Sequence, residues 1–242
     1  MLQILSRQIK VWITPIVLCI SIFMANPAYA EVPVLLDRAE DLVNVITVYP
    51  TTVKTQAAVL AEVTTAEKKE FANIPGFQDS SILKAQDGSG VIALSQWQGK
   101  DLSSFQFYAK EHTLMNINTA GKPQSFACQV QHIETRKVAP SFGEQDTIMF
   151  SQFKMKPDKE QSELANIITG EMPSVLQMVP GLKWASMCPS TNKSTIALIA
   201  SWKSQGDFKS LGQKPGFEKE TNYWQTYANN EHGLFDVVKV IR

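Results

Sequence analysis

The sequence has little histidine or cysteine and no excess charge of either sign. Its 242 residues include three histidines and three cysteines, and 23 basic residues balance 23 acidic ones. No histidine has a cysteine or carboxylate partner at the spacing of metal sites, so we expect no metal. The sequence has no charge runs and no basic surplus, so nothing in its charge indicates nucleic-acid binding. Small-molecule enzymes, small-molecule binders and structural proteins remain.

The chain also lacks a clear membrane-spanning run, which needs about 20 apolar residues. The apolar run at residues 11–24 has 14 residues, follows Arg7 and Lys10, and precedes the small-x-small pattern of residues 28–30. This arrangement predicts a secretory signal peptide over residues 1–30, cleaved before Glu31, with a membrane anchor as the alternative. We therefore expect an exported protein, periplasmic or secreted, with no stable membrane anchor after cleavage.

Two stretches of the chain repeat one another without a gap. Residues 74–97 (IPGFQDSSILKAQDGSGVIALSQW) align with residues 179–202 (VPGLKWASMCPSTNKSTIALIASW), and Pro75 lies 105 positions before Pro180. Internal repetition at this spacing indicates two units of about one hundred residues each.

We expect a first unit at residues 41–138, a linker with Pro and Gly at residues 139–146, and a second, diverged unit at residues 147–242. The first unit should contain a strand at 42–49, a helix capped by Thr51 or Thr52 with an apolar stripe from Val53 to Ile74, hairpin strands at 78–86 and 91–98, a helix from near Asp101 and a closing strand at 126–138. The second should contain a strand at 147–154, a helix with Pro157 in its first turn that Pro173 kinks or ends early, hairpin strands at 183–189 and 195–202, a helix from near Asp207 and a closing strand at 234–241.

This order of elements predicts an α+β fold of the ferredoxin-like βαββαβ type. Such a unit has a four-stranded antiparallel sheet with both helices on one face. Because the bare face of each sheet must be covered, two units in one chain can pack face to face.

Four motifs of the first unit carry a family resemblance: VNVITV at residues 43–48, IPGF at 74–77, DG at 87–88 and SQW at 95–97. The second unit keeps the VPGL and SW motifs and loses the Asn and the Gln. With these motifs the chain resembles the antibiotic biosynthesis monooxygenase-like family of dimeric α+β barrel proteins. The resemblance implies that one chain with two tandem repeats builds the barrel alone, as an intramolecular pseudo-dimer. It also implies a monooxygenase acting on an aromatic or quinol-like compound without a cofactor.

The resemblance implies where the two cysteines lie that remain after Cys19 is removed with the signal peptide. In such barrels the last strand of one half lies beside the second strand of the other. Cys128 opens the former and Cys188 closes the latter, so a disulfide between them is sterically reasonable in an oxidising compartment. Two buried free thiols are the alternative.

Family site residues are matched only in part. Oxygenase members use an Asn four residues before the strand-three Trp and a Tyr six residues after it, where this chain has Ala93 and Ser103. Haem-degrading relatives use an Asn on strand one, which Asn44 matches, and a Trp in the second helix, where this chain has Gln106. They also use a later His, for which His112 could substitute after a register shift. A solvent-facing or structural histidine is the alternative.

The sequence supports a small-molecule pocket better than a particular reaction. Ala93, Ser95 and Trp97 share one face of strand three, and the two small residues leave room beside the large ring. Asn44 on strand one and Tyr108 in the second helix could add the few polar contacts that small-molecule sites use. The alternative is that Trp97 is an ordinary core aromatic. Bulkier residues fill the corresponding face of the second unit, so we expect the site in the first.

Three functions stay open. The first is a cofactor-independent monooxygenase of an aromatic or quinol-like molecule. The second is a non-catalytic periplasmic binder of a small hydrophobic ligand, with haem among the candidates. The third is a structural or stress-related barrel. Fold alone cannot separate them, because function depends on the site.

Overall fold

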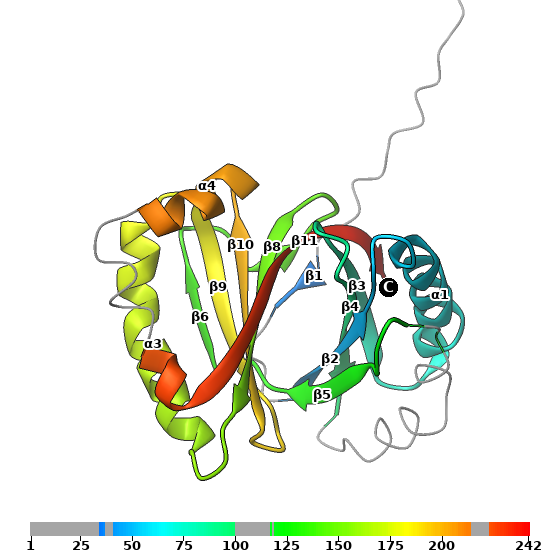
Figure 1. Cartoon of the computed structure of the whole chain (residues 1–242). Helices are drawn as coiled ribbons and strands as arrows, with labels where there is room; N and C mark the ends of the chain where they lie inside the picture. The colour runs from blue at the N-terminus through cyan, green and yellow to red at the C-terminus, as the bar shows by residue number, and fades with distance from the viewer. Residues whose placement is uncertain (1–33, 37–40, 100–116, 118, 214–222) are drawn as a thin grey trace, which may run out of the picture. The chain divides into compact units, whose positions relative to one another are not determined.

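Runs of β-branched and aromatic residues form the strands of one curled antiparallel sheet (Figure 1). The structure, a computed structural model, describes residues 34–36, 41–99, 117, 119–213 and 223–242. Its elements in chain order are β1 (Val34–Leu35), β2 (Leu42–Pro50), α1 (Gln56–Lys69), a 3-10 turn (Phe71–Asn73), β3 (Phe77–Ala85), β4 (Gly90–Gln98), β5 (Gln124–Cys128), β6 (His132–Thr135), β7 (Ser141–Phe142), β8 (Thr147–Met155), α3 (Gln161–Met178), β9 (Leu182–Pro189), β10 (Thr195–Trp202), α4 (Gln205–Lys209), 3-10 turns at Ser210–Gln213 and Tyr223–Thr226, and β11 (Ala228–Ile241).

Nine of the described strands form the main sheet, in the order β5-β2-β4-β3-β11-β8-β10-β9-β6. The strands β1 and β7 form a separate antiparallel pair. In the main sheet β6 pairs with β9, and the end of β11 pairs with β3 after its beginning has paired with β8. The closing strand of each predicted unit therefore lies beside the second strand of the other, as the resemblance implies.

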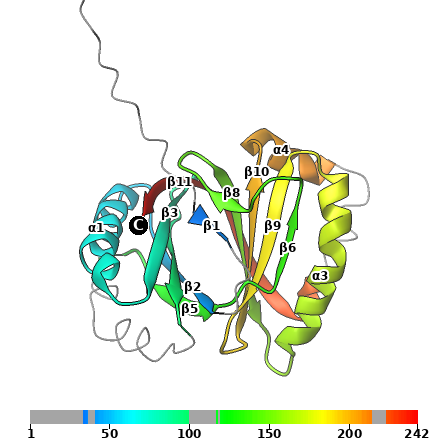
Figure 2. The same cartoon turned by 180° about the vertical axis from the view of Figure 1, so that it is seen from behind.

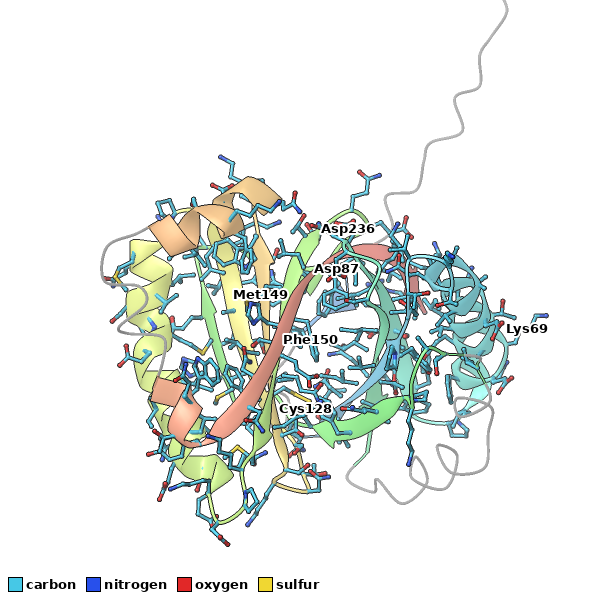
Figure 3. The ribbon with its side chains drawn as sticks, in the orientation of Figure 1. Lys69, Asp87, Cys128, Met149, Phe150 and Asp236 are labelled. Atoms are coloured by element: carbon cyan, nitrogen blue, oxygen red, sulfur yellow. A yellow bond between two sulfur atoms is a disulfide. The ribbon has the colours of Figure 1, made fainter. Side chains whose placement is uncertain are left out.

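Both faces of the sheet are buried. The helix α1 packs on β3 and β4, and α3 packs on β9 and β10, as the two opposite views show (Figures 1 and 2). On the other face, side chains from both ends of the curled sheet meet in one apolar core. This interior core includes Ile46, Leu94, Phe150, Ile199 and Phe235. In Figure 3, Phe150 and Cys128 lie inside, whereas Lys69 points outward from α1.

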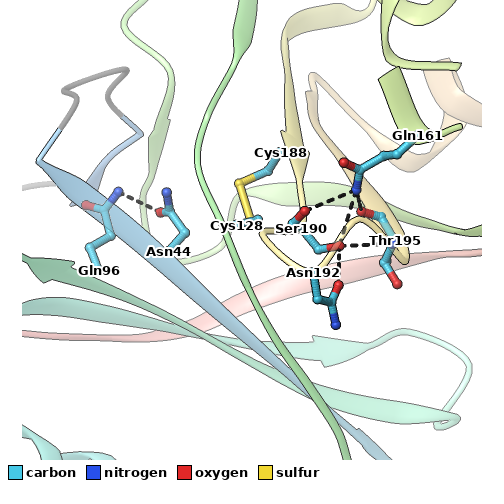
Figure 4. Close-up of a disulfide and its surroundings, with 8 residues drawn as sticks. All are labelled: Asn44, Gln96, Cys128, Gln161, Cys188, Ser190, Asn192 and Thr195. Carbon is cyan, nitrogen blue, oxygen red and sulfur yellow. Dashed lines mark hydrogen bonds between the residues drawn. A yellow bond between two sulfur atoms is a disulfide. The ribbon is translucent and has the colours of Figure 1, made fainter. Parts of the chain in front are cut away.

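The same backbone contacts recur 105 positions apart. The buried Gln56 side chain at the start of α1 donates to the carbonyl oxygens of Ala85 and Gly90, at 2.8 and 3.0 Å. Gln161 at the start of α3 likewise donates to the carbonyl oxygens of Ser190 and Thr195, at 3.2 and 2.6 Å (Figure 4). Each glutamine therefore ties the start of its helix to the hairpin beneath it.

A second recurring contact follows the Pro-Gly turns. The carbonyl oxygen of Gly76 accepts from the amide of Gln98 at 2.7 Å, and that of Gly181 accepts from Lys203 at 2.8 Å. Gly76 has a φ of +91°, and a Cβ there would lie 2.8 Å from the Gln98 carbonyl oxygen. A glycine is therefore required at this turn.

The starts of both main helices differ from the expectation. The helix α1 begins at Gln56, and Val53, which was expected on its apolar stripe, is 80% exposed. Thr52 and Thr55 instead close a turn through backbone and hydroxyl hydrogen bonds, and this turn delays the helix. Pro157 lies in a turn before α3, which begins at Gln161.

Pro173 neither ends α3 nor shortens it, since the helix runs on to Met178. Met172 and Leu176 are buried on either side of the proline in the apolar core under α3. Their packing outweighs the hydrogen bond that a helix-interior proline removes.

The single closing strand expected at residues 126–138 is divided into β5 and β6, and the linker at 139–146 contains the short strand β7. The division allows β5 to pair with β2 while β6 crosses to β9. The predicted signal peptide at residues 1–30 and the helix expected from near Asp101 lie outside the described residues. No helix in the described part of the chain is long and apolar enough to cross a membrane.

Cys128 and Cys188 form a disulfide across the interior core, with Cα atoms 5.4 Å apart (Figure 4). Cys128 ends β5 and Cys188 lies in β9, and both side chains are fully buried. The bond links β5, the edge strand that pairs with β2, to β9 in the other half of the sheet.

We predict that replacing either helix-start glutamine destabilises the fold. Gln56→Leu or Gln161→Leu leaves buried carbonyl oxygens without their side-chain donor, which should cost about 1–3 kcal/mol in the free energy of unfolding. Urea denaturation measures this cost. Gln177→Leu on the exposed side of α3 is the control and should have little effect. Equal midpoints for all three variants and the wild type would contradict the role of these contacts.

We also predict that the disulfide stabilises the fold chiefly by restricting the unfolded chain. It closes a loop with a sequence separation of 60 residues, for which chain entropy gives about 4 kcal/mol. The double variant Cys128→Ala/Cys188→Ala should lose stability on that scale in denaturant titrations. A loss of under about 1 kcal/mol would show that the loop is already restricted without the bond.

Candidate functional site

The alternation of side chains along β4 divides the predicted site residues between two faces of the sheet. Ala93 and Trp97 belong to the apolar core beneath α1, and Ser95 lies on the same face by its position between them. Asn44 lies two residues before Ile46 on β2 and so shares its face, which belongs to the interior core on the opposite side of the sheet. The structure therefore does not bring Asn44 together with Ala93, Ser95 and Trp97. Tyr108 and His112 lie outside the described residues.

Trp97 is held firmly on the α1 side. Its indole N–H donates to the Ser95 hydroxyl at 2.8 Å, and the rings of Phe71 and Phe77 pack edge-on against it at 6.0 and 5.3 Å. Ser95 therefore acts as the partner of the indole. Much of the room expected beside the ring is taken by these two aromatic side chains.

Asn44 pairs with Gln96 on the interior face. The Gln96 side-chain N–H donates to the Asn44 side-chain oxygen at 3.0 Å, and both side chains are buried (Figure 4). Asp79 on β3 is the register partner of Gln96. Burial raises the pKa of Asp79 to about 6, and the positive charge of Arg242 opposes the rise. Asn44, Gln96 and Asp79 form a row across three neighbouring strands. The row ends next to the disulfide, since Asn44 is also the register partner of Cys128.

The face beneath α1 holds a buried carboxyl that the sequence interpretation missed. Glu67 on α1 is 2% exposed, and one of its carboxyl oxygens has no partner among the described residues. Burial raises the pKa of Glu67 to about 7, and the nearby Ser80 hydroxyl opposes the rise. A carboxyl with this pKa changes its protonation state near neutral pH, as a general acid or base must.

Tyr49 completes this polar group from β2. Its side chain is fully buried, and its hydroxyl has no hydrogen-bond partner within the described part of the chain. Burial raises the pKa of Tyr49, the negative charge of Glu67 raises it further, and the Thr47 hydroxyl opposes both. The phenol therefore stays neutral and can donate a proton in a hydrogen bond.

We call Tyr49, Glu67, Ser80, Ser95 and Trp97 the α1-side cluster. Ser80 and Ser95 are direct register partners on neighbouring strands, so the cluster runs from Glu67 through Ser80 and Ser95 to the indole of Trp97. It combines a base, a neutral phenol, hydroxyls and an aromatic ring. In the described residues no group of three or more His, Cys, Asp or Glu side chains is arranged to hold a metal ion.

One sequence signal could have found Glu67. Val59, Val63, Glu67 and Phe71 follow one another at intervals of four, which places the carboxyl inside the apolar stripe of α1. The neighbouring charges of Lys68, Lys69 and Glu70 make the segment read as a solvated helix end. Tyr49 had no such signal, because a tyrosine at a strand end is ordinary core composition.

We predict that Glu67 makes folding stability fall as pH rises. Its pKa of about 7 in the fold lies above its ordinary value of 4.5, so the folded state holds this proton more tightly than the unfolded state. The stabilisation is complete below pH 4.5, decreases between 4.5 and 7, and is lost above 7, a change of roughly 3 kcal/mol.

Denaturant titrations at pH 5 and pH 8 test this dependence. Glu67→Met should be more stable than the wild type at pH 8 and should lose most of the pH slope, whereas the exposed control Glu62→Met on the same helix should keep it. An unchanged slope in Glu67→Met would show that the buried carboxyl does not titrate in this range.

No profile of a known protein family matches the sequence, and no curated protein shows significant similarity to it. Solved structures do match the fold. An anthrone oxidase-like protein superposes with a TM-score of 0.72 at 15% identity, over 85% of this chain and 95% of the other.

Two further structures match less closely. A candidate monooxygenase from Fusobacterium nucleatum gives a TM-score of 0.54 at 12% identity, over 83% of this chain and 94% of its own. One from Lactobacillus acidophilus gives 0.51 at 11% identity, over 84% and 96%. The chain thus has the mixed α+β, ferredoxin-like fold of these monooxygenase-related structures.

Proposed function

We propose that residues 41–138 and 147–242 are two copies of one unit, packed as an intramolecular pseudo-dimer, and that the first copy alone keeps a reactive site. The recurring glutamine and glycine contacts at 105 positions support the duplication. Asn44 faces Gln96 across β2 and β4 as Ile148 faces Ser201 across β8 and β10. The first strands therefore correspond at 104 positions and the later elements at 105.

The α1-side cluster has an apolar counterpart in the second copy. Tyr49, Glu67, Ser80 and Ser95 correspond, in that order, to Phe153, Met172, Ala185 and Ala200. All four of these residues are buried in the apolar core beneath α3. The scaffold thus packs without polar groups at these positions, and a buried carboxyl there costs stability. A buried carboxyl whose pKa the fold raises is a candidate for a functional site.

The proposed activity is a cofactor-independent oxygenation of a small aromatic or quinol-like molecule. Glu67 is the base that removes a proton from an acidic C–H or O–H of the substrate, and this buried carboxyl is the observation that carries the proposal. Tyr49 donates a hydrogen bond to the developing anion. A ring methylene that becomes a carbonyl supplies the four electrons that reduce O₂, so that one oxygen atom enters the product and the other leaves as water. No separate reductant is then required.

The names of the matching structures favour the same reaction class, since one is called anthrone oxidase-like and two are described as candidate monooxygenases. We further propose that residues 1–30 are removed during export and that the protein acts outside the cytoplasm, where the Cys128–Cys188 disulfide persists.

Oxygen consumption tests the proposed activity. Residues 31–242 are incubated with a panel of anthrones and hydroquinones, and oxygen uptake is followed with product analysis. Wild-type protein should oxidise an acidic member of the panel, with a rate that rises with pH through the Glu67 pKa. Glu67→Met, which installs the residue of the second copy, should lower the rate about 10²–10⁴-fold.

Glu62→Met is the matched control, because it makes the same change on the exposed face of α1. Undiminished uptake by Glu67→Met would contradict the role of Glu67. Tight binding of a panel member without oxygen uptake would indicate that the protein binds a ligand and is not an oxygenase.

A further inference from the structure

The two halves of the curled sheet meet at two joints of different extent. At the first, which we call the β3–β11 joint, β11 pairs with β3 over residues 235–241 and 80–85. At the second, the β5–β9 joint, the described residues show one isolated bridge, between Cys128 and Ser190. The amide of Thr191 donates to the carbonyl oxygen of Ala127 there, at 2.9 Å. Backbone pairing is thus much shorter at the β5–β9 joint.

The Cys128–Cys188 disulfide lies within the β5–β9 joint (Figure 4). Cys128 is itself a residue of the isolated bridge, and Cys188 lies two positions before the bridge partner Ser190. Both cysteine side chains are fully buried, but exposed residues follow each of them, Gln129 after Cys128 and residues 191–194 after Cys188. The bond is therefore flanked in sequence by surface segments on both sides of the joint.

The β3–β11 joint holds together without a covalent bond. Phe235 and Leu83 occupy there the positions that Cys128 and Cys188 occupy in the β5–β9 joint. Both are buried in the interior core, and Val237 is the register partner of Leu83. Strand pairing and apolar packing thus suffice at one joint, whereas the other combines a short pairing with a bond that a reductant can break.

We propose that the Cys128–Cys188 disulfide is a redox-sensitive lock on the β5–β9 joint. Reduction frees β5 from the end of β9 by local opening, while the β3–β11 joint and the packing of α1 and α3 persist. A dithiol supplies the electrons: its thiolate attacks one cysteine sulfur, and the other cysteine leaves as a thiolate that takes up a proton. The second thiol of the dithiol then displaces the remaining cysteine, so that two cysteine thiols and one oxidised dithiol result. This lock does not depend on the proposed oxygenase activity.

A lock differs from a bond that only restricts the unfolded chain. Restriction of the unfolded chain raises the free energy of global unfolding, so its loss affects every amide that exchanges through global unfolding, at both joints alike. A lock acts on the folded state at one joint. Its loss gives the amides of that joint a local opening of their own, which exposes little surface.

Native-state hydrogen exchange of residues 31–242, followed by NMR at low urea concentrations, separates these two effects. Oxidised protein is compared with protein reduced by dithiothreitol without denaturation. On reduction the amides of β5 and of residues 188–191 should exchange faster, by roughly tenfold or more, relative to those of β3 and β11. Their exchange should also become nearly independent of urea, because a local opening exposes little surface. Reoxidation with oxidised dithiothreitol should restore the original protection.

Val63→Ala is the matched control, because it removes buried volume beneath α1 and leaves the disulfide intact. Protection should then fall alike at both joints. The double variant Cys128→Ala/Cys188→Ala should reproduce the behaviour of the reduced protein. An unchanged ratio of exchange between the two joints after reduction would overturn the lock, and so would resistance of the native bond to dithiothreitol. Equal loss of protection at both joints would overturn it as well, because the bond would then hold the whole fold.

Discussion

The structure depends on a single antiparallel sheet that is buried on both faces. One face meets the helices α1 and α3, and the other meets its own opposite end in the interior core. Consecutive residues of a strand therefore enter different cores, and neither side of a central strand is solvated. A polar side chain on these strands is shielded from water, so its burial costs stability unless it finds a partner inside the protein.

Because of this constraint, the residues beneath α1 can be compared with those beneath α3. Beneath α3 the strands and the helix contribute apolar residues, Met172 among them, to one buried core. Beneath α1 the corresponding surface contains Glu67, whose ionisation the fold opposes. If only packing mattered, apolar residues like those beneath α3 would also suit the core beneath α1, since the same backbone contacts support both helices. Under the proposed function, the carboxyl is retained for its chemistry at the expense of stability.

Much of the fold follows from local sequence patterns, and much of the site does not. The hairpins β3–β4 and β9–β10 lie within one residue of their expected bounds, because local turn signals define them: Asp87-Gly88 in the first and the polar residues 190–194 in the second. Val53 was misplaced because the Thr52–Thr55 turn competes with helix initiation, and the division of β5 from β6 depends on a partner strand distant in sequence. Trp97 and Ser95 were selected by their types and spacing, and their place in a functional site stays a prediction. Glu67 escaped because burial of one carboxyl in a charged helix end is decided by tertiary packing.

The account is tested most directly by the titration of the Glu67 carboxyl itself. Carbon-13 NMR of glutamate-labelled protein, residues 31–242, follows each side-chain carboxyl through the pH range, and the signal absent from Glu67→Met identifies Glu67. The account predicts a midpoint near pH 7. A midpoint near the ordinary value of 4.5 would mean that Glu67 is solvated, and the proposed base would be wrong.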